Sequence, residues 1–363
     1  MLNAIVVGAG FAGSTHWIPA ITKSNQWELI GVVESNVRRL AEVSHSLPKG
    51  CWTAESVRAI PDAAPKDAVA WVVTPDHLPV VKDLAAAGFT RMVIEKPLVA
   101  REREVGDFLT FAGVHDLKVY ALDHYLQKAL PVFLVLNRIS EHDPHVDLVS
   151  FRGEHSLREI IGALGEIEGA SLVNVEAGEL GIPYLDQHPD YERDLETGGA
   201  IRDLGPHAFA PLIAAGLLHT GAPIHDVSLA RLVRDWRTFV PVRKRDELEM
   251  WVTVLFEHVG RSVNVSFGKV PMKGGERSLT VRGKNGFCFL ALPRNRDAVL
   301  MTNDGRTTRL ALAVSTNDAA VAEVGWYFEG RLPASFDGYL HAACRAIELG
   351  HLIREAYFKE SLR

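Results

Sequence analysis

Hydrophobic and polar positions follow two different patterns along the chain. In the first third, short apolar runs alternate with segments whose apolar residues recur every three or four positions, which predicts strands alternating with helices. This alternation favours a parallel, doubly wound α/β sheet. Pro19 falls inside the helix expected after the first strand, so we expect a kink or an early stop there. The predicted strands are 3–8, 28–34, 68–74, 91–95 and 117–122, with a short one near 51–53, and the later helices are 36–46, 76–87 and 101–113.

A second pattern begins near residue 125. A helical period holds over 126–141, and longer runs then alternate between apolar and polar positions, which predicts a large open sheet, mixed or antiparallel. Gly283–Gly286 and Asn303–Gly305 are typical hairpin turns. Segment 181–198 has no clear period, so we expect a mobile loop near the site. The predicted strands are 146–154, 171–178, 226–236, 249–258, 261–270, 277–283, 287–292 and 297–302, and the predicted helices are 203–217, 316–327 and 336–360.

The first predicted strand leads into a glycine-rich turn. Gly8, Gly10 and Gly13 fit the pattern G-x-G-x-x-G. The first glycine allows a tight turn, the second lets a pyrophosphate approach the backbone, and the third lets the helix pack on the strand. The N–H groups of Phe11 and Ala12 would lie at the positive end of that helix, where an anion is favoured.

The second predicted strand ends in an acid, Glu34, 21 positions after Gly13. A spacing of about 20 residues is typical of a carboxylate that binds the adenosine ribose of a dinucleotide. The sequence therefore predicts an NAD(P)-binding Rossmann domain over 1–123, followed by a second domain over 124–363. Glu34 would repel a 2′-phosphate and favours NAD, whereas Arg38 and Arg39 could cradle that phosphate, so NADP stays an alternative.

Ligands bind beyond the carboxyl ends of the strands in sheets of this type. Lys96 follows a buried strand at that edge, and Pro97 keeps its backbone extended. A lysine placed there can donate a hydrogen bond to a substrate oxygen and favour an alkoxide, although a solvated lysine at a strand end is the alternative. Besides the glycine-rich turn, the residues expected to contact the cofactor are Thr74, Pro75, His77, Glu95, Lys96 and Pro97.

A second set of candidates lies where the predicted helix 203–217 begins. Asp203 is suited to cap this helix, and His207, four residues later, can lie on the same face. A neighbouring acid can fix the tautomer of a histidine and raise its basicity, as a general base requires. The alternative is a capping aspartate with a half-buried histidine. Arg202, beside Asp203, is expected to contact substrate.

A third set follows the last strand of the first sheet. If a helix begins at His124, then His124 and Lys128 share one face, and two cationic donors there would grip an anion or a phosphate. Asp123 would point elsewhere, towards His207. The alternative is a helix cap at Asp123 with a solvated face beyond it.

Composition and charge narrow the class of partner. The net charge is −6 and the pI about 6.2, which leaves no electrostatic footprint for nucleic acid or an acidic membrane. Three scattered cysteines predict reduced thiols in a cytoplasm. The first strand begins too early to leave room for a signal peptide, and the longest apolar stretch, 208–218, is too short to span a bilayer. The histidines lack metal-ligand spacing, so no metal site and no covalent nucleophile are expected.

The order of these motifs carries a resemblance to a known family. The chain resembles the Gfo/Idh/MocA oxidoreductases over most of its length in Gly8–Gly13, Thr74-Pro75, Glu95-Lys96-Pro97, Gly198-Gly199 and Asp203-x-x-x-His207. The resemblance implies an N-terminal Rossmann domain and a C-terminal α/β domain that binds substrate and forms homodimer or homotetramer contacts through an open sheet. It also implies that Lys96, Asp203 and His207 form the catalytic group, with His207 as proton acceptor.

A narrower resemblance concerns Asp123-His-Tyr-Leu-Gln-Lys128, which is similar to a motif of glucose-6-phosphate dehydrogenases, although Gln127 replaces a glycine. It implies that His124 and Lys128 hold the substrate, including a phosphate, and that Asp123 supports His207. Together the two resemblances predict hydride transfer between nicotinamide and an alcohol of a sugar, sugar phosphate or cyclitol. A non-catalytic regulator that senses dinucleotide or sugar is the alternative.

Overall fold

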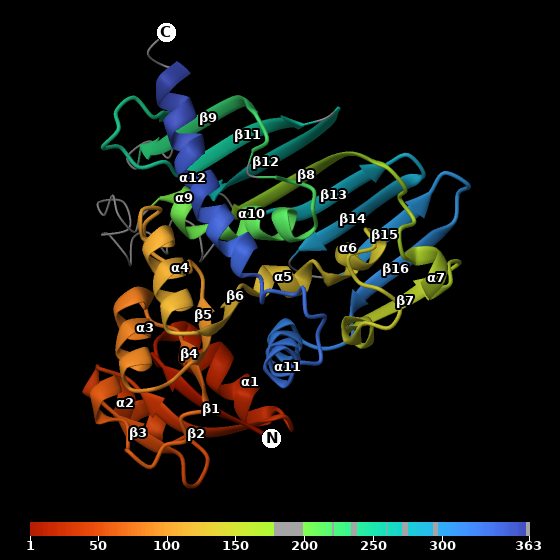
Figure 1. Ribbon diagram of the computed structural model, residues 1–363. Coiled ribbons are helices and arrows are strands. Elements are labelled where there is room, and N and C mark those ends of the chain that lie inside the picture. The colour runs from red at the N-terminus through yellow and green to blue at the C-terminus, as the bar shows by residue number, and fades with distance from the viewer. Residues whose placement is uncertain are drawn as a thin grey trace. The chain divides into compact units, whose positions relative to one another are not determined.

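In the computed structural model the chain folds into two units, which are drawn in Figure 1. Unit 1 comprises Met1–His124 and Val314–His341, and unit 2 comprises Tyr125–Ala313 and Ala342–Arg363. The structure describes residues 1–177, 199–219, 221–233, 238–258, 260–270, 275–292 and 297–360.

Unit 1 is built on a six-stranded sheet in the order β3-β2-β1-β4-β5-β6, with every neighbouring pair parallel. The strand order turns back between β1 and β4, which is where doubly wound sheets bind ligands beyond the carboxyl ends of their strands. The predicted doubly wound sheet is confirmed. The strands are β1 (Leu2–Val7), β2 (Trp27–Val33), β3 (Trp52–Ala54), β4 (Val69–Val72), β5 (Arg91–Glu95) and β6 (Lys118–Leu122).

The first helix of unit 1 does not stop at Pro19, which lies in the first turn of α1. A π-helical turn precedes it, in which the N–H of Ile18 bonds the carbonyl of Gly13. A wider turn accommodates a proline that lacks an N–H, so the expected irregularity sits one turn earlier than Pro19 itself. The helical segments of this part of the unit are η1 (Gly13–Trp17), α1 (Ile18–Lys23), α2 (Val37–Ser44), η2 (Val57–Ala59), α3 (His77–Ala86) and α4 (Glu104–Val114).

The central strands of this sheet are apolar on both faces, as expected of a parallel sheet covered by helices. All four residues of β4 are buried, and the ring of Trp71 lies 5.9 Å from that of Trp17 and 5.5 Å from that of Trp27. This core fixes the carboxyl ends of β1, β4 and β5 along one edge. Most of the predicted cofactor residues follow those ends, while Glu34 and Arg38 follow β2.

Helix α11 (Thr316–Glu329) belongs to unit 1, whereas the domain limits expected from the sequence assign it to 124–363. The indole N–H of Trp27 donates to the carbonyl of Val321 at 3.0 Å. The ammonium of Lys118 donates to the carbonyl of Tyr327 at 2.8 Å. These side chains come from β2 and β6, so the helix completes the first core although it lies far away in the sequence.

Unit 2 contains a ten-stranded mixed sheet in the order β10-β9-β11-β12-β8-β13-β14-β15-β16-β7, as far as the described residues show. Among the strands that the structure describes here, only β12 and β8 pair in parallel. The sequence reading missed β10 and β16, the second of which completes the hairpin predicted at 303–305. The strands are β7 (Val149–Gly153), β8 (Ile167–Glu176), β9 (Ile224–Val233), β10 (Thr238–Pro241), β11 (Trp251–His258), β12 (Arg261–Lys269), β13 (Arg277–Gly283), β14 (Gly286–Leu292), β15 (Asp297–Thr302) and β16 (Thr307–Leu312).

Helices pack on this sheet and are visible along it in Figure 1. The predicted helix 126–141 is divided into α5 and α6, and Pro131 lies in the first turn of α6, where a proline is well tolerated. None of the described helices is both long and apolar enough to cross a membrane. The helical segments are α5 (His124–Lys128), α6 (Leu130–Val135), η3 (Pro144–Leu148), α7 (Leu157–Ile160), α9 (Ala200–Asp203), α10 (Gly205–Ala214) and α12 (Leu340–Glu360).

Candidate active site

The glycine-rich turn of unit 1 has the geometry that its sequence predicts. Gly8 has φ = +102°, and a Cβ there would lie 2.6 Å from the carbonyl oxygen of Val73. A Cβ at Gly13 would lie 2.1 Å from the carbonyl oxygen of Gly8. At Gly10 the nearest atom is a guanidinium nitrogen of Arg39 at 3.6 Å. Two glycines therefore hold the turn closed, and the third leaves a space that fits the pyrophosphate of a dinucleotide.

Glu34 lies at the end of β2 and binds the same turn. Its Oε2 accepts the backbone N–H of Ala9 at 2.7 Å, and its Oε1 accepts that of Asn36 at 2.9 Å. Each oxygen keeps a second lone pair, which can accept a ribose hydroxyl. Arg39 lies 3.9 Å from Oε2, whereas Arg38 pairs with Glu42 on the exposed surface of α2. Of the two arginines that the sequence offers for a 2′-phosphate, Arg39 is thus the one beside the turn, and Arg38 is not.

The loops after β4 and β5 are joined through His77. Its Nδ1 lies 2.7 Å from the carbonyl oxygen of Pro97, which can only accept, so Nδ1 carries the proton and Nε2 is an acceptor. Nε2 has no hydrogen-bond partner in the part of the chain that the structure describes. Burial is the main reason that the pKa of His77 falls to about 4, with a smaller contribution from Lys96. His77 is therefore neutral at physiological pH, and Thr74 and Pro75 begin the loop that carries it.

Lys96 emerges where the sequence places it, at the carboxyl end of β5. Its backbone N–H donates to the carbonyl of Leu122 in β6 at 3.1 Å, and its side chain is half-buried next to Glu95. The bond between Lys96 and Pro97 is cis. Asp123 is buried directly after β6.

In unit 2, Asp203 does not cap the helix that carries His207. It is the last residue of α9, and Leu204 occupies the capping position of α10. The carboxylate of Asp203 instead pairs with the ammonium of Lys269, 3.1 Å away. His207 is buried, and its ring stacks on Tyr125 with centroids 4.3 Å apart and planes 28° apart. The expected capping role is wrong because a partner from β12 binds the carboxylate.

Lys269 begins a row of alternating charges. Its ammonium also pairs with Oε2 of Glu176 at 2.5 Å, and Oε1 of Glu176 pairs with Arg277 at 2.6 Å. The Arg277 guanidinium lies 5.7 Å from the centroid of the Tyr125 ring. Among the influences on the pKa of Lys269, burial is the largest and lowers it, but the carboxylates of Asp203 and Glu176 together raise the pKa above its usual value. The ammonium therefore stays charged.

Sequence reasoning missed Lys269, Glu176, Arg277 and Tyr125. One signal was available: Lys269 continues the inward-facing positions of an alternating strand, after Val263, Val265 and Phe267. A charge at an inward position requires a buried partner. Nothing in the sequence, however, says that the partners are 66 and 93 positions away.

Asn174 is another buried polar residue on this face. It lies opposite Arg277 in the register between β8 and β13, and it is 1% exposed. Neither its Oδ1 nor its Nδ2 has a hydrogen-bond partner among the residues that the structure describes. A group with both a donor and an acceptor to satisfy fits a hydroxyl-bearing ligand or a water.

Lys128 also lies at Tyr125. Its ammonium is 4.1 Å from the centroid of the Tyr125 ring, so Lys128, Tyr125 and His207 form one group in unit 2. His124 begins α5 and lies with Asp123 in unit 1, while Arg202 precedes Asp203 in α9. Gly199 has φ = +86° and begins the turn into α9. Gly198 and the predicted loop 181–198 lie outside the described residues.

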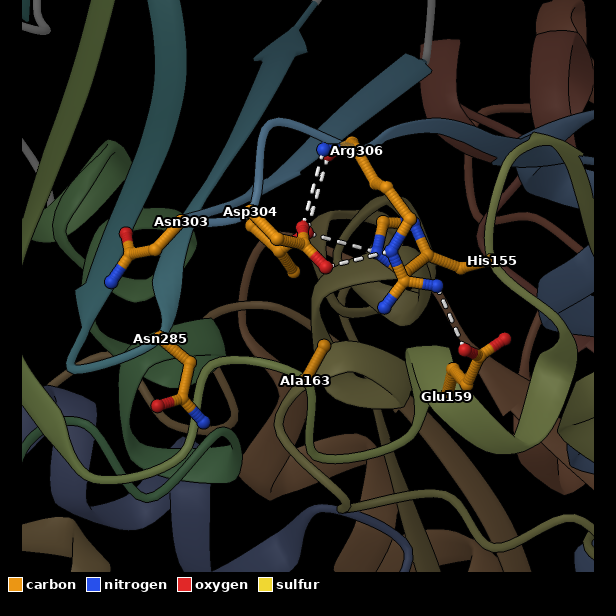
Figure 2. Close-up of a pocket in the computed structure, with 8 residues that line it drawn as sticks. His155, Glu159, Ala163, Asn285, Asn303, Asp304 and Arg306 are labelled. Atoms are coloured by element: carbon orange, nitrogen blue, oxygen red, sulfur yellow. Dashed lines mark hydrogen bonds and ion pairs between the residues drawn. The ribbon is translucent and has the colours of Figure 1, made fainter.

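A separate cavity of about 360 Å³ opens beside the hairpin of β15 and β16 (Figure 2). None of the predicted site residues lines it. Arg306 bridges Asp304 and Glu159 at 2.8 Å each, and His155 bonds Thr308 and Thr302. The charged groups that line this cavity pair with one another, so we interpret these contacts as structural.

Comparison with known proteins agrees with this geometry. Residues 2–121 match the model of Gfo/Idh/MocA, described as an oxidoreductase family with an NAD-binding Rossmann fold. This match lies within the first domain. No match was found among curated proteins.

Solved structures resemble the chain over nearly its whole length. KijD10, a 3-ketoreductase from Actinomadura kijaniata in complex with NADP and TDP-benzene, is 17% identical with a TM-score of 0.67, covering 98% of this chain and 97% of that one. UDP-N-acetylglucosamine 3-dehydrogenase GnnA from Acidithiobacillus ferrooxidans is 19% identical with a TM-score of 0.66 over 98% and 97%. A putative myo-inositol dehydrogenase from Sinorhizobium meliloti is 17% identical with a TM-score of 0.66 over 97% and 95%. At these identities the likeness shows the two-domain fold.

The first test separates the glycines of the Gfo/Idh/MocA turn. We expect Gly13→Ala to lower the free energy of unfolding by about 2–4 kcal/mol, because a rigid backbone oxygen occupies the space of the new Cβ. Gly10→Ala should change it by less than about 1 kcal/mol, because only the flexible end of Arg39 is nearby, yet weaken NADH binding roughly tenfold. Urea unfolding and fluorescence titration with NADH measure both. Equal losses of stability in the two variants would contradict this assignment.

The second test uses the low pKa of His77. As the pH falls from 6.5 towards 4, His77 takes up a proton in the unfolded chain but not in the native one, so stability present at neutral pH is lost on acidification. His77→Asn keeps a donor for the Pro97 carbonyl and does not titrate. We expect the stability difference between wild type and variant to change by about 3 kcal/mol between pH 7 and pH 4. Urea unfolding of both proteins at both pH values measures this difference. The same stability difference at pH 7 and at pH 4 would disprove the prediction.

Proposed function

We propose that the protein is an NAD(P)-dependent oxidoreductase that moves a hydride between nicotinamide and a secondary alcohol of a sugar, sugar phosphate or cyclitol. The observation that carries the proposal is the pair Asp203 and His207 in unit 2, an ionised carboxylate one helical turn from a buried imidazole, in a chain whose first domain is a Gfo/Idh/MocA Rossmann domain. The similar structures include a 3-ketoreductase, a UDP-N-acetylglucosamine 3-dehydrogenase and a putative myo-inositol dehydrogenase, which supports this substrate class.

The proposed chemistry assigns one task to each residue. Nicotinamide, when bound, accepts or returns the hydride. Lys96 donates a hydrogen bond to the substrate oxygen and stabilises the negative charge that develops there. His207 accepts the hydroxyl proton during oxidation and returns it during reduction. Asp203 favours the protonated form of His207 as it appears, and Asp123 is proposed as its second acidic neighbour.

The cofactor preference that we propose is NAD. The carboxylate of Glu34 is held beside the glycine-rich turn, where it would accept ribose hydroxyls and repel a 2′-phosphate. Arg39, close to both Glu34 and Gly10, supports NADP as the second choice.

The substrate would be held by groups around Tyr125 and β8. Lys128 and His124 are proposed to bind an anionic group, and Arg202 the ring oxygens. Asn174 is suited to a pair of sugar hydroxyls, because a hydroxyl both donates and accepts. We also propose a cytoplasmic homodimer or homotetramer. The small number of cysteines, three in 363 residues, supports the compartment, and the partly exposed Phe287, Phe289 and Met301 on strands of the large sheet support an interface.

A turnover screen tests the proposal. Sugars, cyclitols and hexose phosphates are supplied with NAD or NADP, and the absorbance of the reduced nicotinamide is followed. Oxidation of at least one ring alcohol is expected. Tight nucleotide binding without turnover across the panel would reject the enzyme and favour a non-catalytic sensor.

Removing the proposed proton acceptor or the proposed lysine should abolish turnover while sparing the cofactor site. We expect His207→Ala to lower kcat by about 10²–10⁴ and Lys96→Ala by a similar factor, because each acts on the reacting oxygen. The Kd for NADH should change less than about twofold. His142→Ala, at an exposed histidine, is the control. A proportional loss of nucleotide affinity and rate would contradict these roles.

The charge on Lys128 should matter only for anionic substrates. We expect Lys128→Met to raise KM for a hexose 6-phosphate roughly 10–100-fold, as the loss of a charge-assisted hydrogen bond predicts, and to leave KM for the free hexose unchanged. Lys284→Met, at an exposed lysine between β13 and β14, is the matched control. If both substrates are affected equally, Lys128 does not bind the phosphate.

A further inference from the structure

Lys269 has no task in the reaction proposed above, yet it is among the most unusual side chains of unit 2. It ends β12 on the inward face and is 2% exposed. An ammonium removed from water to this degree requires charged partners, and it has two at bonding distance. One of them, Asp203, carries a role in the proposed chemistry. The other, Glu176, belongs to the adjacent strand β8 and lies opposite Lys269 in the register.

An unbroken series of contacts leads from Asp203 to His207. The ammonium of Lys269 lies 3.1 Å from Oδ2 of Asp203 and 2.5 Å from Oε2 of Glu176. Glu176 pairs with Arg277, whose guanidinium lies beside the ring of Tyr125. That ring stacks on His207. All of these residues belong to unit 2, so the row exists within one folded body.

Asp203 and His207, the two ends of this row, are also close together in the sequence. Residues 200–214 are helical except at Leu204, so Asp203 and His207 are one helical turn apart, a spacing that puts side chains about 5–6 Å from each other. At that distance the charge of a carboxylate favours a protonated imidazole. Whatever fixes the charge and direction of Asp203 therefore acts on His207.

We propose that Lys269 is a positioning residue of the active site, which holds Asp203 as an ionised carboxylate in one orientation and thereby sets how readily His207 takes a proton. This rests on the function proposed above. The ammonium partly cancels the field of Asp203 at His207, so the imidazole stays neutral and able to accept a proton. Glu176 and Arg277 complete the row and keep Lys269 in place.

Other charges face this region, and all of them except Glu176 are shared by every variant compared below. Arg202 lies on α9 itself. Glu249, just before β11, and Arg354 of α12 form an ion pair at the beginning of α9. Glu176 comes from β8, Arg277 from β13 and Lys128 from α5. In the single variants at position 269 all of these groups stay constant, so the His207 midpoint reports on the Lys269 charge.

The experiment follows the histidine rather than turnover alone. The full chain is prepared with ring-labelled histidine, and the His207 resonance is identified by its absence from His207→Gln. We expect Lys269→Met to raise the pH midpoint of the His207 titration by about 0.5–1 unit, because Asp203 loses the cation that offsets it. Lys269→Arg should restore the wild-type midpoint. The acidic limb of the pH profile of kcat/KM for alcohol oxidation should move by the same amount.

Lys269→Met leaves two carboxylates facing each other and can fail to fold. The double variant with Lys269→Met and Glu176→Gln removes one charge of each sign and is used in that case. A smaller upward shift is expected, because the lost Glu176 carboxylate partly offsets the lost ammonium. Lys284→Met controls for the loss of a lysine. An unchanged His207 midpoint in a folded variant that lacks the Lys269 ammonium would overturn the proposal, even if the rate fell. A shifted midpoint in a protein that oxidises nothing in the screen would retain the positioning role and reject the proposed reaction.

Discussion

A buried ammonium must lie between carboxylates, and this single requirement explains much of the geometry of unit 2. Lys269 meets it through the parallel pairing of β12 with β8, which places it opposite Glu176. A slip of one residue in that register would move Lys269 to the other face of the sheet. The antiparallel pairing of β8 with β13 then puts Arg277 opposite Asn174, within reach of the same carboxylate. Register, charge and the position of Asp203 are therefore set together.

In unit 1 the corresponding constraint is the shape of the glycine-rich turn. Its glycine-rich turn is closed by backbone atoms that leave no space for a side chain at Gly8 or Gly13. Glu34 then binds the N–H of Ala9 from the neighbouring strand. Contacts within the chain shape and anchor the turn, and a turn fixed by such contacts reduces the cost of ordering when a nucleotide binds.

The sequence predicts what depends on local pattern and fails where distant segments decide. The first sheet, its glycine-rich turn and the position of Lys96 follow from strand periods and spacing, and the structure confirms them. The hairpin signal at 303–305 was present, yet β16 was missed because its six residues do not alternate between polar and apolar: three polar residues precede three apolar ones. The sequence assigns helix α11 to the second domain, but in the structure Trp27 and Lys118 bind it to the first unit. The partners of Asp203 could not be predicted, because strand register across such separations leaves no local mark.

The short helix α9 shows why buried charge is used here instead of apolar packing. Four residues cannot hold a helix by themselves, since nucleation costs more than one turn returns. At its beginning, Glu249 accepts the N–H of Ile201 and pairs with Arg354. At its end, Lys269 binds Asp203. Apolar side chains of similar volume often match or exceed a buried ion pair in stability, so stability alone does not explain these charges. Directional bonds at both ends do what apolar contacts cannot: they fix the rotation of α9, and with it the direction in which the Asp203 carboxylate faces.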